Sequence, residues 1–98
     1  MIVECTLKKE QLAKIPTPVH LATTLLMNGG FFFGDVREGK TEENKVYVWN
    51  MDELIGIIEY QQLDLFVNIR VTDAPKQTVL TDEMLYIAQS LNTILFIK

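Results

Sequence analysis

The sequence predicts an α+β domain with a split β-α-β (ferredoxin-like) arrangement and an appended α-β unit. Two observations lead to this expectation. Segments with strand or helix periodicity follow one another in the order β-α-β-β-α-β-α-β, and the first six match the split arrangement. The chain has 98 residues, the size of one domain, because two separate cores would each bury too little surface. We therefore expect a single α/β domain over residues 1–98. The alternative is a small mixed-sheet α/β sandwich with helices on both faces.

A strand and a helix are predicted at the start of the chain. Residues 2 to 7 alternate weakly between apolar and polar and indicate the first strand. Thr17 is a suitable N-cap, and Pro18 suits the first helical position because its missing N–H would be unpaired there anyway. The glycines at 29 and 30 supply a stop, so a helix is expected over residues 18 to 28. Its core-facing stripe consists of Val19, Ala22, Leu25 and Leu26.

A β-hairpin is predicted between residues 31 and 49. Polar, turn-forming residues from 39 to 44 separate its two arms. Gly34 lies in the first arm, where a glycine often marks a bulge or a close backbone approach. The second arm alternates Tyr47 and Trp49 with two valines, so both of its faces are apolar and each needs a cover.

The second half of the chain completes the predicted order. Asn50, followed three residues later by Glu53, resembles a capping box and predicts a helix from about 51 to 62. The buried side of that helix would carry Leu54, Ile55 and Ile58. The remaining predicted elements are an alternating strand over residues 64 to 71, a helix capped by Thr81, and a short apolar strand over residues 93 to 97.

Charge and composition exclude several classes of protein. The formal net charge is -4 and the pI about 4.8, which argues against nucleic acid as a partner. We expect no membrane association, because no apolar run approaches the roughly 20 residues that a spanning helix needs. The N-terminal residues lack the pattern of a secretory signal, and Cys5 is the only cysteine. A cytoplasmic location is therefore expected.

The side chains needed for common catalytic sites are scarce. His20 and Cys5 are the one histidine and the one cysteine, so a nucleophile–base pair or a zinc site has few candidates. The glycines at 29 and 30 follow a helix rather than precede one, which is the wrong polarity for a phosphate-binding loop. We expect no catalytic residues, no metal and no cofactor, hence a protein that is not an enzyme.

Carboxylates gather in and just after the predicted hairpin, and aromatic residues accompany them. Aromatic side chains beside charged ones are typical of interface hot spots, and an acidic surface steers a basic partner toward it. The sequence therefore predicts a protein-binding domain that engages a basic partner through an acidic aromatic hairpin. The candidate binding residues are Tyr47, Trp49, Glu42, Glu43, Asp52, Glu53 and Phe66.

In size, acidity and scarcity of catalytic groups, the chain is similar in kind to small bacterial immunity proteins and inhibitors. This resemblance implies a small acidic inhibitor or immunity-type interaction protein, and it is one of composition. Two alternatives come from other classes. A homo-oligomeric structural or regulatory domain would use the two-sided apolar strands, including Phe31, Phe32 and Phe33, or an open sheet edge for self-association. A small-ligand binder would use carboxylates in a pocket.

Overall fold

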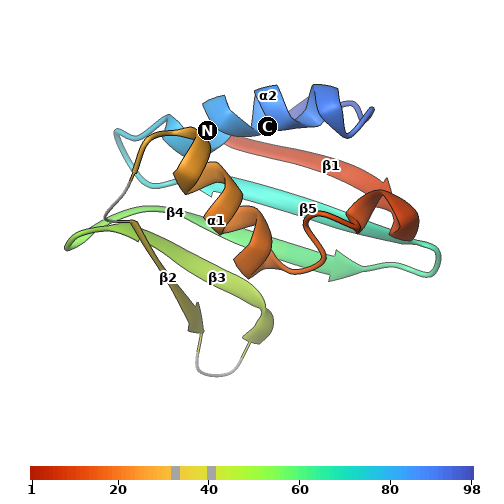
Figure 1. Cartoon of the computed structure of the whole chain (residues 1–98), viewed down its shortest axis with the longest axis horizontal. Helices are drawn as coiled ribbons and strands as arrows, with labels where there is room; N and C mark the ends of the chain where they lie inside the picture. Colours follow the sequence, from red (N-terminus) through yellow and green to blue (C-terminus); the bar gives the residue numbers. More distant parts are fainter. Residues whose placement is uncertain (32–33, 40–41) are drawn as a thin grey trace.

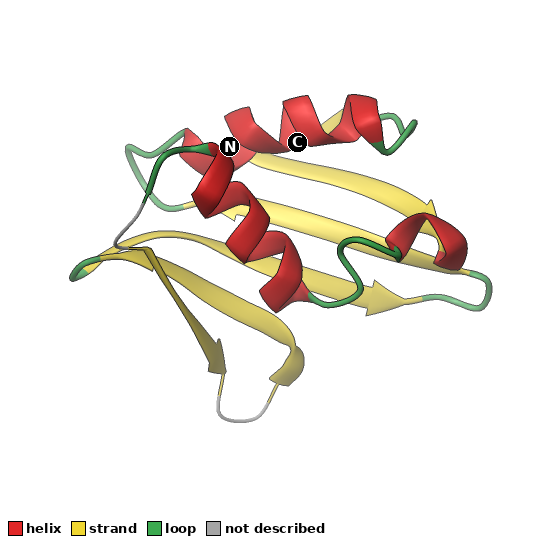
Figure 2. Cartoon of the chain, in the orientation of Figure 1, coloured by secondary structure: helices red, strands yellow, loops and turns green. Residues whose placement is uncertain are grey.

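The computed structural model describes residues 1–31, 34–39 and 42–98 of the chain. A twisted antiparallel sheet forms one layer, and two helices form the other (Figures 1 and 2). The strands lie in the order β2-β3-β4-β5-β1-β6. The elements are β1 (Ile2–Lys8), the 3₁₀ helix η1 (Lys9–Leu12), α1 (Pro18–Asn28), β2 (Gly34–Gly39), β3 (Glu42–Asn50), β4 (Glu53–Gln62), β5 (Phe66–Asp73), α2 (Val79–Ser90) and β6 (Phe96–Ile97).

The predicted ferredoxin-like split arrangement is not confirmed, although the α+β class is. In that arrangement each of two helices joins a pair of parallel strands that have one other strand between them. Here α1 joins β1 to β2, which are separated by β3, β4 and β5, and the chain between β3 and β5 forms the strand β4 rather than a second crossover helix. Every neighbouring pair of described strands is antiparallel. β2 to β5 form a consecutive meander, and β1 adds to its far side by pairing with β5. β6 then pairs with the outer edge of β1.

Helix α1 begins and ends where the sequence predicts. The Thr17 hydroxyl accepts the His20 backbone N–H, and Pro18 takes the first helical position. After the helix, Gly30 has a φ of 76°, the left-handed conformation that glycine adopts without strain. The buried side holds Leu21 in addition to three residues of the predicted stripe, while Val19 is only partly buried.

The predicted helix over residues 51 to 62 is wrong, because residues 51 and 52 form a turn and residues 53 to 62 form strand β4. A β-bulge explains the misleading spacing. Val48 of β3 pairs with Gly56 and Trp49 pairs with Leu54, so Ile55 is an extra residue in β4. The bulge lets Ile55 and Ile58 both face the core, at a spacing of three that a regular strand would place on opposite faces.

Helix α2 is confirmed, but its predicted cap is wrong. The N-cap is Thr78, and Thr81 lies in the first turn, fully buried. The Asp73 carboxylate, at the end of β5, accepts both the backbone N–H and the hydroxyl of Thr81. A carboxylate at this end of a helix also complements the helix dipole. The final strand is shorter than predicted, since β6 contains only residues 96 and 97.

The core lies between the helices and one face of the sheet. α1 packs over β2, β3 and β4, and α2 packs over β1, β4 and β5 (Figure 1). Cross-strand neighbours on this face, including Val3, Val46, Ile58, Ile69 and Val71, are all fully buried. The opposite face carries no described helix, so the alternative of a sheet covered by helices on both sides is wrong for the described residues.

Candidate functional site

Tyr47 and Trp49 lie on the face of the sheet that neither helix covers. Their neighbours in β3, Val46 and Val48, point into the core, and the alternation of the strand turns the two aromatic rings the other way. Both rings are partly buried. Tyr47 lies opposite Ile57 of β4, which is also partly buried. These side chains form an apolar strip on the open face.

Two cations of the chain itself flank the aromatic rings. The Arg37 guanidinium carbon lies 4.5 Å from the centroid of the Trp49 ring, and Lys45 Nζ lies 5.7 Å from that of Tyr47. Arg37 Nε also donates to Asp35 Oδ2 at 2.9 Å. Arg37 and Asp35 are not among the site residues predicted from the sequence. The predicted hairpin could have indicated them, because pairing of its two arms places Arg37 opposite Tyr47 and Asp35 opposite Trp49.

Two of the predicted acids, Asp52 and Glu53, follow Trp49 at the turn between β3 and β4. Asp52 and Glu53 are exposed there, next to the exposed side chain of Met51. Glu53 Oε1 accepts a hydrogen bond of 2.6 Å from Gln77 Nε2. The sequence predicts both acids at the start of a helix. Instead, Asp52 lies in a tight turn in which Met51 has a φ of 57°, and Glu53 is the first residue of β4, opposite Asn50 on the face that the helices cover. We call Tyr47, Trp49, Asp52 and Glu53 the aromatic–acidic patch.

The other predicted binding residues do not add to this patch. Phe66 is exposed on the same open face, but it pairs with Lys8 and lies beyond Gln62, at the end of β4 opposite to Trp49. Glu42 and Glu43 lie at the start of β3, and their side chains are outside what the structure describes. Phe32 and Phe33 also lie outside the described residues, while Phe31 packs against the core.

A row of alternating charges crosses the middle of the open face. Lys45, Glu59, Arg70 and Glu4 are successive cross-strand neighbours from β3 to β1. Glu4 is only 8% exposed, and its carboxylate accepts from Lys98 Nζ at 2.9 Å and Arg70 Nε at 2.6 Å. Lys98, which has the larger effect, and Arg70 hold the pKa of the Glu4 carboxyl below its usual 4.5. The negative charge of Glu4, at the β1 end of the row, is therefore neutralised by cations of the chain itself.

Cys5 and His20 have the surroundings of structural residues. Cys5 is 1% exposed, and burial raises the pKa of its thiol to about 11. A buried, protonated thiol is a poor nucleophile. His20 is exposed in the first turn of α1, where its Nδ1 lies 2.7 Å from the Thr17 hydroxyl. Burial likewise raises the pKa of Tyr60, whose hydroxyl donates to the Ile15 carbonyl within the core.

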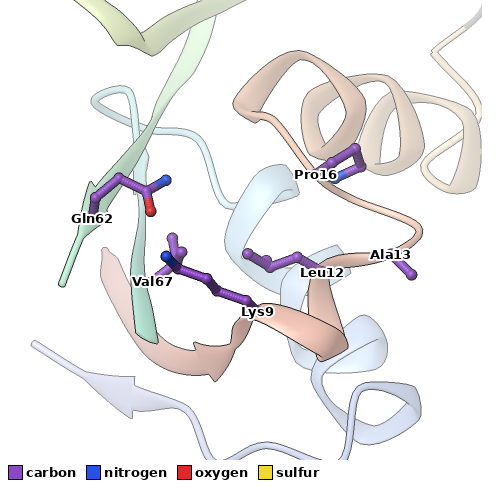
Figure 3. A pocket seen from close by; sticks show the side chains of 6 residues that line it. All are labelled: Lys9, Leu12, Ala13, Pro16, Gln62 and Val67. Atoms are coloured by element: carbon purple, nitrogen blue, oxygen red, sulfur yellow. The ribbon is translucent and has the colours of Figure 1, made fainter. Parts of the chain in front are cut away.

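Two hollows lined by described residues lie away from the aromatic–acidic patch. One hollow of about 390 Å³ opens between η1 and the end of β4 (Figure 3). Its described lining offers one ammonium and one amide among apolar side chains, so it lacks the carboxylates that the small-ligand alternative requires. Those lining residues are Lys9, Leu12, Ala13, Pro16, Gln62 and Val67. Another hollow, of about 500 Å³, runs beside the exposed side of α2, and its described lining, Asp82, Leu85, Tyr86 and Gln89, offers a single carboxylate.

Comparison with protein-family models, curated proteins and solved structures found no match to this chain. Within residues 1–31, 34–39 and 42–98, no three side chains of His, Cys, Asp or Glu are grouped so as to hold a metal ion. None of the helices in this described part is long and apolar enough to cross a membrane. The aromatic–acidic patch is therefore the candidate site that the described geometry favours.

Proposed function

We propose that the chain is a non-enzymatic protein-binding domain that engages a basic segment of another protein through the aromatic–acidic patch. One observation carries the proposal. Trp49 and Tyr47 stand on the sheet face that no described helix covers, and the exposed acid Asp52 follows Trp49 by three residues, in the β3–β4 turn. Tryptophan, tyrosine and arginine dominate the binding energy of protein interfaces.

The distribution of charge supports a basic partner. The segment from Gly34 to Glu53 holds six acids and three bases, so it accounts for most of the formal net charge of -4. Two of the bases, Arg37 and Lys45, lie against the aromatic rings. Asp52 in the β3–β4 turn and Glu53 directly after it are exposed, so their carboxylates can meet cations of a partner. Complementary charge of this kind raises the association rate and fixes the orientation of binding.

The partly buried rings support an anchoring role. A side chain that is already held by its neighbours loses little conformational freedom on binding. The Arg37 guanidinium stacks on Trp49 and is held in turn by Asp35, so the ring and its cation are ordered before a partner arrives. A partner with an apolar residue between basic ones would cover Trp49 and pair with the two exposed acids.

Selection from a random-peptide library on the immobilised protein tests this function. We expect the selected peptides to carry net positive charge and to shift the fluorescence of Trp49, the only tryptophan of the chain, when they are titrated. The double variant D52K/E53K should bind the selected peptides about tenfold more weakly or worse, because it places like charges against the peptide. Trp49→Ala should weaken the same peptides.

The matched control changes the charge equally at a distance from the patch. Glu10→Lys combined with Asp64→Lys alters two exposed acids, one on η1 and one in the β4–β5 turn. This control should retain the affinity of the wild-type chain. Selected peptides with no preference for positive charge, or an equal loss of affinity in the control, would contradict the proposal.

A further inference from the structure

We propose that the β2 edge of the sheet pairs with the β2 edge of a second copy of the chain, which joins two sheets into one. This inference goes beyond the proposed function, because it involves the strand edge rather than the aromatic–acidic patch. β2 is the outermost strand of the sheet, beyond β3. The outer side of such a strand presents N–H and C=O groups that another strand can pair with.

The charges of β2 are complementary to a second copy of the same strand. Asp35 and Arg37 project from the open face, and each side chain is about half exposed, 54% and 51%. Antiparallel pairing about a two-fold axis at Val36 places Asp35 opposite Arg37 of the partner subunit, and Arg37 opposite Asp35 of the partner subunit. Directly opposed residues have Cβ atoms about 4.5–5.5 Å apart, close enough for such pairs to attract.

Charge also selects this register over its neighbours. Centring the two-fold axis on Asp35 would place two carboxylates directly opposite each other, and centring it on Arg37 would place two guanidinium groups there. Like charges in opposed positions destabilise strand pairing. With the axis at Val36, the junction instead brings together four charged side chains, Asp35 and Arg37 of each copy. Within one chain these two side chains form an ion pair of 2.9 Å, and across the junction each lies opposite a side chain of the other sign.

The β2 edge lacks two residue types that commonly prevent such pairing, and its register shift, between Glu38 and Gly39, lies beyond the Asp35–Arg37 segment. Proline and lysine at an edge strand block or repel a second strand. The sequence of β2, Gly-Asp-Val-Arg-Glu-Gly, contains neither. The proposed two-fold axis is perpendicular to the sheet, so the helices of both copies would cover the same face. The open faces, each with its own Trp49, would then be continuous across the junction.

Charge reversal tests the proposal by sedimentation velocity over a concentration series that reaches the millimolar range. We expect the wild-type chain to form a dimer, and Arg37→Asp and Asp35→Arg each to weaken it about tenfold or more, because each variant opposes like charges. The double variant D35R/R37D should recover the dimer. An equimolar mixture of the two single variants should form a heterodimer, which also demonstrates that both are folded.

Each other outcome overturns the inference. A wild-type chain that stays monomeric throughout the series, or a dimer that neither single reversal weakens, rules out pairing of β2 edges. A dimer that Phe96→Lys abolishes and Arg37→Asp leaves intact uses the β6 edge instead, where Phe96 is exposed. The D52K/E53K variant leaves both β2 charges in place, so a failure of the peptide-binding function is distinguishable from a failure of dimerisation.

Discussion

At the scale of single residues, the most consequential polar contact is that between Asp73 and Thr81. The carboxylate of Asp73 is only 7% exposed, and it accepts the backbone N–H of the third residue of α2 together with a buried hydroxyl. It thus caps a helix from the end of a strand eight residues earlier in the chain. Buried donors that lose such a partner keep their full desolvation cost.

Asp73→Ala is therefore expected to lower the free energy of unfolding by about 1–3 kcal/mol, because the buried Thr81 N–H loses its acceptor and the Thr81 hydroxyl keeps only the Thr78 carbonyl. Urea denaturation followed by circular dichroism measures the change. Asp64→Ala removes an exposed carboxylate in the β4–β5 turn and should change the unfolding free energy by less than about 0.5 kcal/mol. Equal effects of the two substitutions would show that the capping contact contributes little.

Glu4 gives the molecule a defined dependence of stability on pH. Lys98 and then Arg70 hold its folded-state pKa below 4.5, so folding favours the ionised carboxylate. The stabilisation is complete at neutral pH and is lost as the pH falls below 4.5 and through the depressed folded-state pKa. Glu4→Gln should be less stable than wild type at pH 7, and the difference should shrink over that acidic range.

Unfolding free energies measured at several pH values test this expectation. Glu10→Gln removes an exposed carboxylate on η1 and should follow the wild-type profile. A difference between Glu4→Gln and wild type that stays constant with pH would mean that the lost contact is one of packing rather than of charge.

At the scale of elements, local signals account for what the sequence predicts correctly and incorrectly. Helix α1 is bounded by Thr17, Pro18 and the glycines at 29 and 30, and these act within a few residues of each other. The pattern of strand β4 predicts a helix because the bulge at Ile55 creates helical spacing among its buried residues. That bulge depends on pairing with β3, which no local pattern within β4 contains.

Gly56 allows α2 to approach β4 closely. A Cβ atom at this position would overlap the Leu80 side chain of α2 and lie 2.5 Å from the Thr72 carbonyl oxygen. Gly56→Ala should therefore cost about 1–3 kcal/mol of unfolding free energy, because a backbone oxygen cannot rotate away. Chemical denaturation of Gly34→Ala provides the comparison.

A Cβ at Gly34 would lie 2.6 Å from Leu26 Cδ2, which belongs to a side chain that can change rotamer. The close approach expected at Gly34 is present, yet its substitution should cost less than that of Gly56. A larger loss of stability in Gly34→Ala would mean that Leu26 is fixed by its neighbours in α1 and the core.

At the scale of the whole molecule, the Cα radius of gyration of 12.4 Å agrees with the roughly 13 Å expected for one compact domain of about 100 residues. The alternation of Tyr47 and Trp49 with buried valines was predictable, because strand geometry alone requires it. The placement of both helices on the other face was not, since it depends on how distant segments pack. The local strand pattern therefore predicts which side chains of the candidate patch point away from the core, whereas their exposure depends on the tertiary packing of the helices.

The position of β1 within the sheet has a consequence for the kinetics of folding. β1 pairs Ile2 with Thr72 and Leu7 with Val67, whereas β2 to β5 pair with their immediate neighbours in the chain. Closing so long a loop costs more entropy than forming the meander. We expect the meander to assemble before the rate-limiting barrier and β1 to dock after it.

Stopped-flow folding and unfolding in urea measure that order. Leu7→Ala, a truncation in β1, should mainly accelerate unfolding, while Ile58→Ala, a truncation in the meander, should mainly slow folding. The reverse assignment of the two rates would place the N-terminal strand in the folding nucleus. Under the expected order, the last strand to join the sheet is the first one in the chain.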